Sequence, residues 1–162
     1  MNLRRFLLLF SVHPEPEGRK VDNIPAFFKK EKALKYLVIA EKPSVSKSIA
    51  KVIGAYRQED GYLEGGDCVV SWCLGHLAEY AAPEHYDERY ENWCFEDLPI
   101  LPVEWKLLVH STKKPQFNVL RKLLRSKKFD YVVNACDAGR EGEAIFRRVY
   151  ALAGSKLPIK RL

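Results

Sequence analysis

The sequence predicts an α/β fold with a mainly parallel four-stranded sheet flanked by helices. Three short apolar runs have the length and composition of strands buried on both faces: Tyr36–Ala40, Cys68–Trp72 and Tyr131–Ala135. Segments with apolar residues at helical spacing follow the first and third runs. Alternation of buried strands with amphipathic helices is typical of a parallel sheet.

The composition fits one globular domain. The chain has 162 residues, of which 47% are hydrophobic and 30% are charged, with a net charge of +6. No apolar run approaches the roughly 20 residues that span a bilayer, which excludes a membrane protein. The four cysteines form no C-x-x-C pair, so we expect reduced thiols in or near the core of a cytoplasmic protein: Cys68, Cys73, Cys94 and Cys136.

Residues 1–34 differ from the rest of the chain. A basic and then apolar stretch, Arg4–Phe10, is similar to the start of a signal peptide, but polar and turn-forming residues follow it in place of a cleavage site. We predict an amino-terminal extension over residues 1–34 and a single domain over residues 35–162. The extension is either a peptide that docks on this domain or another, or a disordered terminus.

The first strand leads into a charged turn and a helix. Pro43 ends the strand, and Ser44 is a good N-cap. The helix that follows ends at Gly54 and has a predicted inner face of Val45, Ile49, Val52 and Ile53. Glu41 and Lys42 therefore lie at the carboxyl end of a strand, where open α/β sheets bind ligands.

The middle of the chain contains a turn-rich stretch, a strand and an irregular segment. Residues 61–67 read as a turn before the second strand, and Gly75-His76-Leu77 follows that strand. Residues 83–102 lack a helical or strand period, and we expect an ordered excursion pinned by aromatic side chains. His76 either contacts a phosphate or a base, or fills a polar niche.

The last part of the chain repeats the strand and helix pattern. An amphipathic helix is marked by Phe117, Leu120, Leu123 and Leu124. The third strand precedes Asp137–Glu143 and a helix from about Glu141 to Leu152, with an inner face of Ala144, Ile145, Val149 and Leu152. Residues 157–162 begin a fourth strand, within which the chain ends, so we expect the amino-terminal part of a longer protein.

Charge is distributed in two blocks. Residues 77–105 carry eight acidic side chains and one basic side chain, Arg89, whereas residues 106–129 carry eight basic side chains and no acidic one. The basic block either follows a phosphate backbone or is a solvated helix face.

Acidic side chains follow two of the predicted strands. Glu41 comes after the first strand, and Asp137 and Glu141 come after the third. Oxygen ligands without His or Cys suit Mg²⁺, which bridges to phosphate oxygens. Lys42 and Arg140 are placed to neutralise such a phosphate. The alternative is a strand-end turn followed by a helix cap.

Three motifs together resemble the TOPRIM domain of type IA DNA topoisomerases. They are Leu37–Ser44, Gly75-His76-Leu77 and Asp137–Glu143. Two further stretches are closest to the topoisomerase III branch: Trp72–Leu77 and Leu98–Pro102. The resemblance covers about residues 35–162 and implies the TOPRIM fold, which is Rossmann-like.

The resemblance also implies an activity and a set of site residues. Such enzymes cut one DNA strand through a tyrosine, pass another strand and reseal the break without ATP. The resemblance implies the roles of individual residues through their positions in these motifs. The catalytic residues are Glu41, Lys42 and Arg140, the Mg²⁺ ligands are Glu41, Asp137 and Glu141, and the DNA contacts are Lys42, Ser44, Lys47, His76 and Arg140. The expected partners are single-stranded DNA and the remaining topoisomerase domains, in a bacterial cytoplasm or nucleoid.

Two departures qualify the resemblance. Gly139 occupies the middle position of the family's D-x-D-x-E pattern, which weakens metal binding unless Glu143 compensates. No tyrosine of this chain lies in a segment that matches the nucleophile, so we expect that the chain alone cannot relax DNA. The alternatives are a stand-alone TOPRIM nuclease or primase-type protein and a non-catalytic DNA-binding module.

Overall fold

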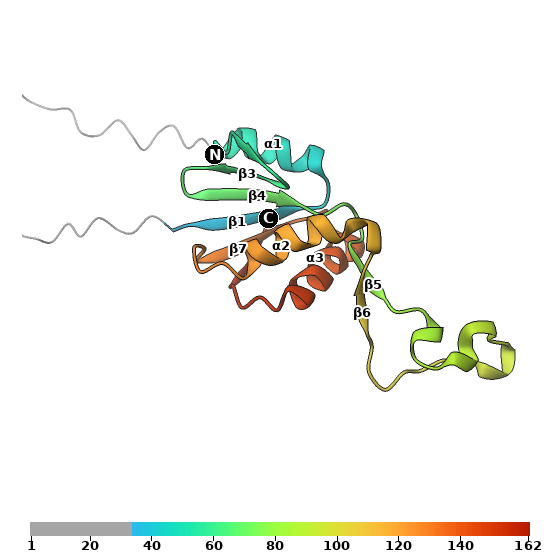
Figure 1. The fold of residues 1–162 in the computed structure, drawn as a ribbon. Helices are drawn as coiled ribbons and strands as arrows, with labels where there is room; N and C mark the ends of the chain where they lie inside the picture. The colour runs from blue at the N-terminus through green and yellow to red at the C-terminus, as the bar shows by residue number, and fades with distance from the viewer. Residues whose placement is uncertain (1–33) are drawn as a thin grey trace, which may run out of the picture. The chain divides into compact units, whose positions relative to one another are not determined.

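The computed structural model describes residues 34–162, so the predicted extension, apart from Leu34, lies outside the described residues (Figure 1). A six-stranded sheet has the order β2-β3-β4-β1-β7-β8. Its strands are β1 (Tyr36–Ala40), β2 (Arg57–Glu59), β3 (Tyr62–Gly65), β4 (Cys68–Trp72), β7 (Tyr131–Ala135) and β8 (Ile159–Arg161). Neighbours among β4, β1, β7 and β8 are all parallel, which confirms the predicted four-stranded parallel core.

An antiparallel hairpin of β2 and β3 extends this core beyond β4. The glycine-rich sequence predicts only a turn over residues 61–67, and neither strand is predicted from it. The residues alternate in register with β4, for example Leu63 with Val70, and Leu63 is buried. The reason for the difference is long-range pairing: the edge of β4 needs hydrogen-bond partners, and this need outweighs the turn propensity of the glycines.

Helices cover both faces of the sheet (Figure 1). Helix α1 (Pro43–Ile53) packs on one face with Val38, Ala40 and Val70, whereas α2 (Lys114–Leu124) and α3 (Arg140–Ala153) pack on the other with Leu37 and Ile39. Successive residues of a strand point to opposite faces, so β1 contributes to both cores. This is the reason that its sequence is apolar throughout.

The boundaries and faces of the helices differ from the predictions in detail. Helix α1 begins at Pro43, one residue before the predicted cap Ser44, because proline at the first helical position lacks only an N–H that would be unpaired anyway. Gly54 ends the helix with φ of 84°, as expected. Val52 is 85% exposed, so its predicted inner position is wrong. It lies about 200° around the helix from the buried Ala50.

Helix α3 begins at Arg140, one residue before the predicted start. Its buried face includes Phe146, which the sequence analysis missed, whereas Ala144 and Leu152 are only half-buried.

Three cysteines lie in the core, as expected, but Cys94 is exposed, so its predicted core position is wrong. Across the described part of the chain, no helix combines the length and apolarity that crossing a membrane requires.

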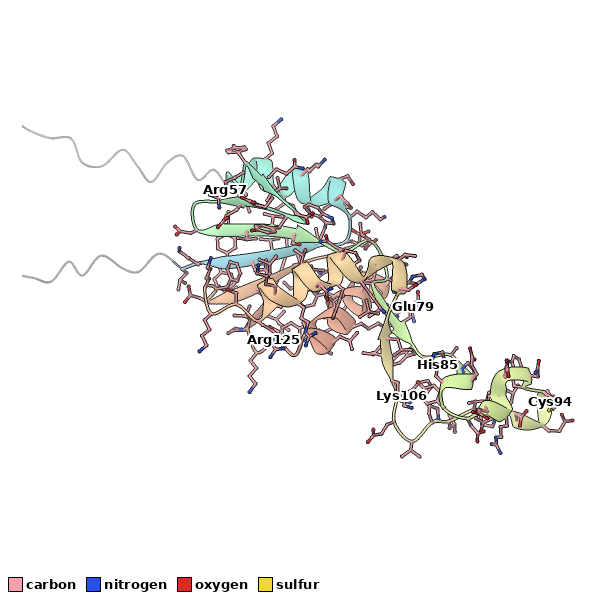
Figure 2. The ribbon with its side chains drawn as sticks, in the orientation of Figure 1. Arg57, Glu79, His85, Cys94, Lys106 and Arg125 are labelled. Atoms are coloured by element: carbon pink, nitrogen blue, oxygen red, sulfur yellow. The ribbon has the colours of Figure 1, made fainter. Side chains whose placement is uncertain are left out.

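A second, two-stranded sheet carries the irregular segment. Strands β5 (Ala78–Tyr80) and β6 (Leu107–Val109) pair antiparallel and form a stalk. Beyond the stalk, the chain forms short 3-10 helices: η2 (Pro83–His85), η3 (Glu88–Asn92) and η4 (Phe95–Asp97). We call residues 82–105 the excursion. Figure 2 shows it projecting from the domain, with Cys94 near its far end.

Aromatic side chains pack at the base of the excursion, although two of the three rings, Tyr80 and Trp105, lie outside the predicted segment 83–102. The Trp105 ring meets the rings of Tyr80 and Tyr86 edge-on, with centroids 5.3 and 6.4 Å apart. The Tyr86 hydroxyl accepts a hydrogen bond of 3.0 Å from the backbone N–H of Lys106. These contacts order a segment that lacks regular secondary structure.

Candidate functional site

The carboxyl ends of β1 and β7 place two predicted acids at one edge of the sheet. The strands are parallel and in register, with Ala40 opposite Ala135, so Glu41 and Asp137 both emerge at the same end. A cleft of about 790 Å³ opens there. The described residues that line it are Glu41, Lys42, His76, Asp137, Ala138, Gly139, Arg140, Glu141, Gly142, Ala144 and Arg148.

Six of the predicted site residues therefore line one cleft. They are Glu41, Lys42, His76, Asp137, Arg140 and Glu141. Ser44 and Lys47, predicted as DNA contacts, are exposed on α1 and do not line it. The Ser44 carbonyl accepts a hydrogen bond from Ser48 Oγ.

Glu41 is the buried acid of the cleft. It is only 7% exposed, and its Oε1 lies 3.4 Å from Nζ of Lys42, whose side chain is exposed. Beneath Glu41, a hydrogen bond to the Cys136 thiol and burial raise the pKa of Cys73 well above its usual range, and the charge of Glu41 acts in the same direction. Cys73 is therefore neutral at pH 7, and it places no second negative charge beside the carboxylate.

The loop from β7 to α3 is fixed by the buried side chain of Asn134. Its Oδ1 accepts a hydrogen bond of 3.1 Å from the backbone N–H of Cys136, and its Nδ2 donates one of 2.7 Å to Glu143 Oε2. Glu143 Oε1 also accepts a bond from Nε of Arg147. The Glu143 carboxylate is thus bound on both oxygens and does not line the cleft, so it does not replace the acid missing at Gly139.

Arg161 of β8 holds the same loop from outside. Its guanidinium donates to the carbonyl oxygens of Asn134 and Asp137, at 3.1 and 2.8 Å. The sequence analysis missed both Asn134 and Arg161. An asparagine within an apolar strand was a usable signal for a buried polar role. Arg161 gave no signal, because its role depends on the pairing of β8 with β7.

Gly142 lets the first turn of α3 approach the loop closely. A Cβ atom at this position would lie 2.3 Å from the carbonyl oxygen and 2.8 Å from the nitrogen of Asp137. Gly139, the N-cap of α3, is different: its φ of −157° is ordinary extended backbone, and no heavy atom lies within 4 Å of a Cβ built there. Of these two glycines, packing therefore requires only Gly142.

The three predicted metal ligands share the cleft without forming a compact cluster. Within residues 34–162, no three His, Cys, Asp or Glu side chains lie close enough to hold a metal ion directly. Glu141 is 76% exposed at its side chain, and its Oε1 lies 3.4 Å from Nε2 of His76. An open cleft with carboxylate oxygens as its acidic donors fits Mg²⁺ that keeps several of its waters.

His76 connects the cleft to the stalk. Its Nδ1 lies 3.4 Å from Nη1 of Arg148, and its carbonyl oxygen accepts a hydrogen bond of 2.8 Å from Nζ of Lys113. The Arg148 guanidinium lies over the ring of Tyr80, with Cζ 5.0 Å from the centroid. No sequence pattern indicates Arg148, because its role depends on how α3 packs beside β5.

Comparison with known proteins gives a consistent result. The Toprim domain family matches residues 36–161. The chain is 43% identical over 129 residues to DNA topoisomerase 3 of Staphylococcus epidermidis, 44% over 128 residues to that of Bacillus subtilis, and 45% over 128 residues to that of Bacillus cereus. These alignments cover 79–80% of this chain but only 18% of each relative, so the chain spans less than a fifth of their length.

Proposed function

Because the chain belongs to the Toprim domain family, we propose that it supplies the acidic, Mg²⁺-binding half of the active site of a type IA topoisomerase III. The observation that carries this proposal is the cleft itself. The buried Glu41 and its neighbour Lys42 share the cleft with Asp137, Arg140 and Glu141. The matched relatives are named as DNA topoisomerases, so the proposed substrate is DNA, in a single-stranded segment.

In the proposed reaction, a tyrosine from another part of the enzyme attacks the phosphorus atom and becomes linked to the 5′ phosphate. The tyrosine releases its hydroxyl proton to solvent, the bond to the 3′ oxygen breaks, and Glu41 passes that oxygen a proton taken up from water. Lys42 and Arg140 stabilise the negative charge on the phosphate oxygens. The Lys42 ammonium acts as a point charge, whereas the Arg140 guanidinium can donate two parallel hydrogen bonds. Resealing reverses these steps and needs no ATP, since the phosphotyrosyl link keeps the energy of the broken bond.

Toprim domains of topoisomerases bind metal, and we propose that the ion here is Mg²⁺. Asp137 and Glu141, with Glu41, are the residues that would hold it. When bound, the ion neutralises and positions the phosphate. An enzyme that acts on chromosomal DNA in this way works in the bacterial cytosol.

Metal binding tests the proposal directly. We expect millimolar Mg²⁺ to raise the melting temperature of the chain, because a ligand that binds only the folded state stabilises it. Asp137→Asn and Glu141→Gln should reduce that rise. Glu96→Gln, on the excursion, removes the same charge outside the cleft and should leave it unchanged. An equal response of all variants would contradict the proposed metal site.

DNA relaxation is the second test. The chain alone, with Mg²⁺, should leave supercoiled plasmid unchanged, because the proposed nucleophile lies elsewhere. Mg²⁺-dependent relaxation by the chain alone would contradict this division of labour. Nicking of single-stranded DNA that is abolished by Glu41→Gln would instead favour a stand-alone nuclease.

A further inference from the structure

Helix α3 presents a second cation to the cleft, Arg148, in addition to Arg140. Glu141, Ala144 and Arg148 are spaced three and four residues apart, so they lie on one face of the helix, and all three line the cleft. Arg148 lies two turns from Arg140, or about 12 Å along the helix axis. The two guanidinium groups are thus placed to contact different groups of one extended ligand.

The orientation of Arg148 is set by its neighbours. Its guanidinium lies over the face of Tyr80, 5.0 Å from the ring centroid, and Nη1 lies 3.4 Å from His76 Nδ1. Tyr80 is itself held edge-on by Trp105, at 5.3 Å. Arg148 is half-buried between these contacts. A guanidinium stacked on an aromatic ring loses little further freedom when it binds an anion.

Arg148 also lacks an acidic partner within residues 34–162, since no carboxylate there lies within 4.0 Å of its guanidinium. The adjacent Arg147 is different, because its Nε lies 2.7 Å from Glu143 Oε1. Glu141, the acid on the cleft-facing row of α3, instead contacts His76, with Oε1 3.4 Å from Nε2. Apart from the contact of Nη1 with His76, the donors of Arg148 are therefore available for an anion, and a phosphate accepts from two guanidinium donors at once.

We propose that Arg148, oriented by Tyr80, binds a backbone phosphate of the single-stranded DNA segment that enters the cleft. This phosphate is a different one from the phosphate beside Glu41 and Arg140. Tyr80 acts as a positioning residue, because it contacts Arg148 and not the DNA. The proposal rests on the proposed function, which supplies DNA as the substrate class.

The test measures binding of a fluorescein-labelled oligothymidylate to the 162-residue chain by fluorescence anisotropy, over a series of salt concentrations. Arg148→Gln should weaken binding about tenfold and reduce the slope of log K against log salt by about 0.7, the value for one phosphate contact on a single strand. Arg147→Gln is the matched control. It removes the same charge from the same turn of α3 but outside the cleft, and it should stay within about twofold of the parent.

Tyr80 provides a second, independent arm. Tyr80→Leu should weaken binding about as much as Arg148→Gln, because it removes the ring that orients the guanidinium. Tyr80→Phe keeps the ring and should bind normally. Arg148→Lys keeps the charge without the planar fork, so it should weaken binding but preserve the salt slope. This variant decides the question if Arg148→Gln does not fold.

Two results overturn the proposal: an Arg148→Gln affinity and slope equal to those of Arg147→Gln, or Tyr80→Leu binding equal to that of Tyr80→Phe. Failure of the proposed function gives another pattern. In that case the parent chain does not bind the oligonucleotide, or Lys42→Gln leaves binding unchanged. Weak binding by Lys42→Gln with normal binding by Arg148→Gln overturns only the role of Arg148.

Discussion

The close contact between α3 and the β7–α3 loop predicts that Gly142→Ala destabilises the chain. The added Cβ would lie 2.3 Å from the carbonyl oxygen of Asp137, whereas carbon and oxygen atoms in contact are about 3.3–3.6 Å apart. The loop or the helix must therefore move by about 1 Å. Neither moves freely, because Arg161 and the Asn134 side chain hold the loop.

Two opposing terms set the magnitude. Overpacking costs about 1–3 kcal/mol, and the obstructing atoms are backbone atoms that cannot rotate away, so the upper part of that range applies. Replacing glycine by alanine in a helix returns up to about 1 kcal/mol. We therefore expect a net loss of about 2 kcal/mol in the free energy of unfolding. For a domain of this size, this lowers the melting temperature by about 5–10 °C.

Urea unfolding followed by circular dichroism measures this loss, with Gly139→Ala as the control. Both changes add one methyl group near the start of α3, but the control position has no heavy atom within 4 Å and an ordinary φ. Because alanine is a poorer N-cap than glycine, the control should lose at most about 1 kcal/mol, less than Gly142→Ala. If Gly142→Ala proves as stable as Gly139→Ala, the close approach of helix and loop is not as described.

Three further predictions concern other parts of the chain. Gly139 is the N-cap of α3 and has no side chain that could accept a hydrogen bond from the helix, and there is room for one. We therefore expect Gly139→Asp to add about 0.5–1 kcal/mol to the free energy of unfolding and to tighten Mg²⁺ binding measured by calorimetry. Unchanged Mg²⁺ affinity would argue against a third acid there. Replacing residues 82–105 by Asn-Gly should leave the melting temperature within a few degrees, because the Ala81–Lys106 backbone bond and the main core persist; loss of the fold would refute this. Thiol titration should find one reactive cysteine in the native chain, Cys94, and three more in denaturant. A hydrogen bond to Asp97 raises the pKa of Cys94. The thiolate fraction, and with it the reaction rate, should therefore continue to increase with pH beyond the range in which a free thiol titrates. A rate that levels off within that range would contradict the effect.

The parallel core was predictable because the composition of its strands shows that they are buried on both faces. Tyr36–Ala40 and Tyr131–Ala135 are apolar on both faces, which only a central strand with helices on both sides requires. The hairpin of β2 and β3 was not predictable in this way. Its residues are polar, glycine-rich and only partly buried, and its strands form because β4 offers an edge.

The candidate site was predictable to the extent that topology determines it. Acids that follow neighbouring parallel strands must emerge at one edge of the sheet, and this topology alone assigns Glu41 and Asp137 to the same cleft. The positions of His76 and Arg148 depend instead on how α3 packs beside the stalk. No local pattern encodes that contact, because it joins residues 72 positions apart.

Two acids of the cleft each contact a nitrogen-bearing side chain that also lines it. Glu41 lies beside Lys42, and Glu141 lies beside His76, each at 3.4 Å. Carboxylates that lie close together repel one another, whereas separate contacts with Lys42 and His76 reduce that repulsion. A phosphate and Mg²⁺ that enter together would exchange these partners, since the phosphate attracts the cations and the metal attracts the acids. In the proposed function, binding of either ligand therefore favours binding of the other by the same factor, because coupling between two binding sites is reciprocal. The position of Glu141 suits this exchange. Its side chain is 76% exposed in the first turn of α3, and Asn134 and Arg161 hold the loop before that helix, so the side chain can change partner while the backbone keeps its place.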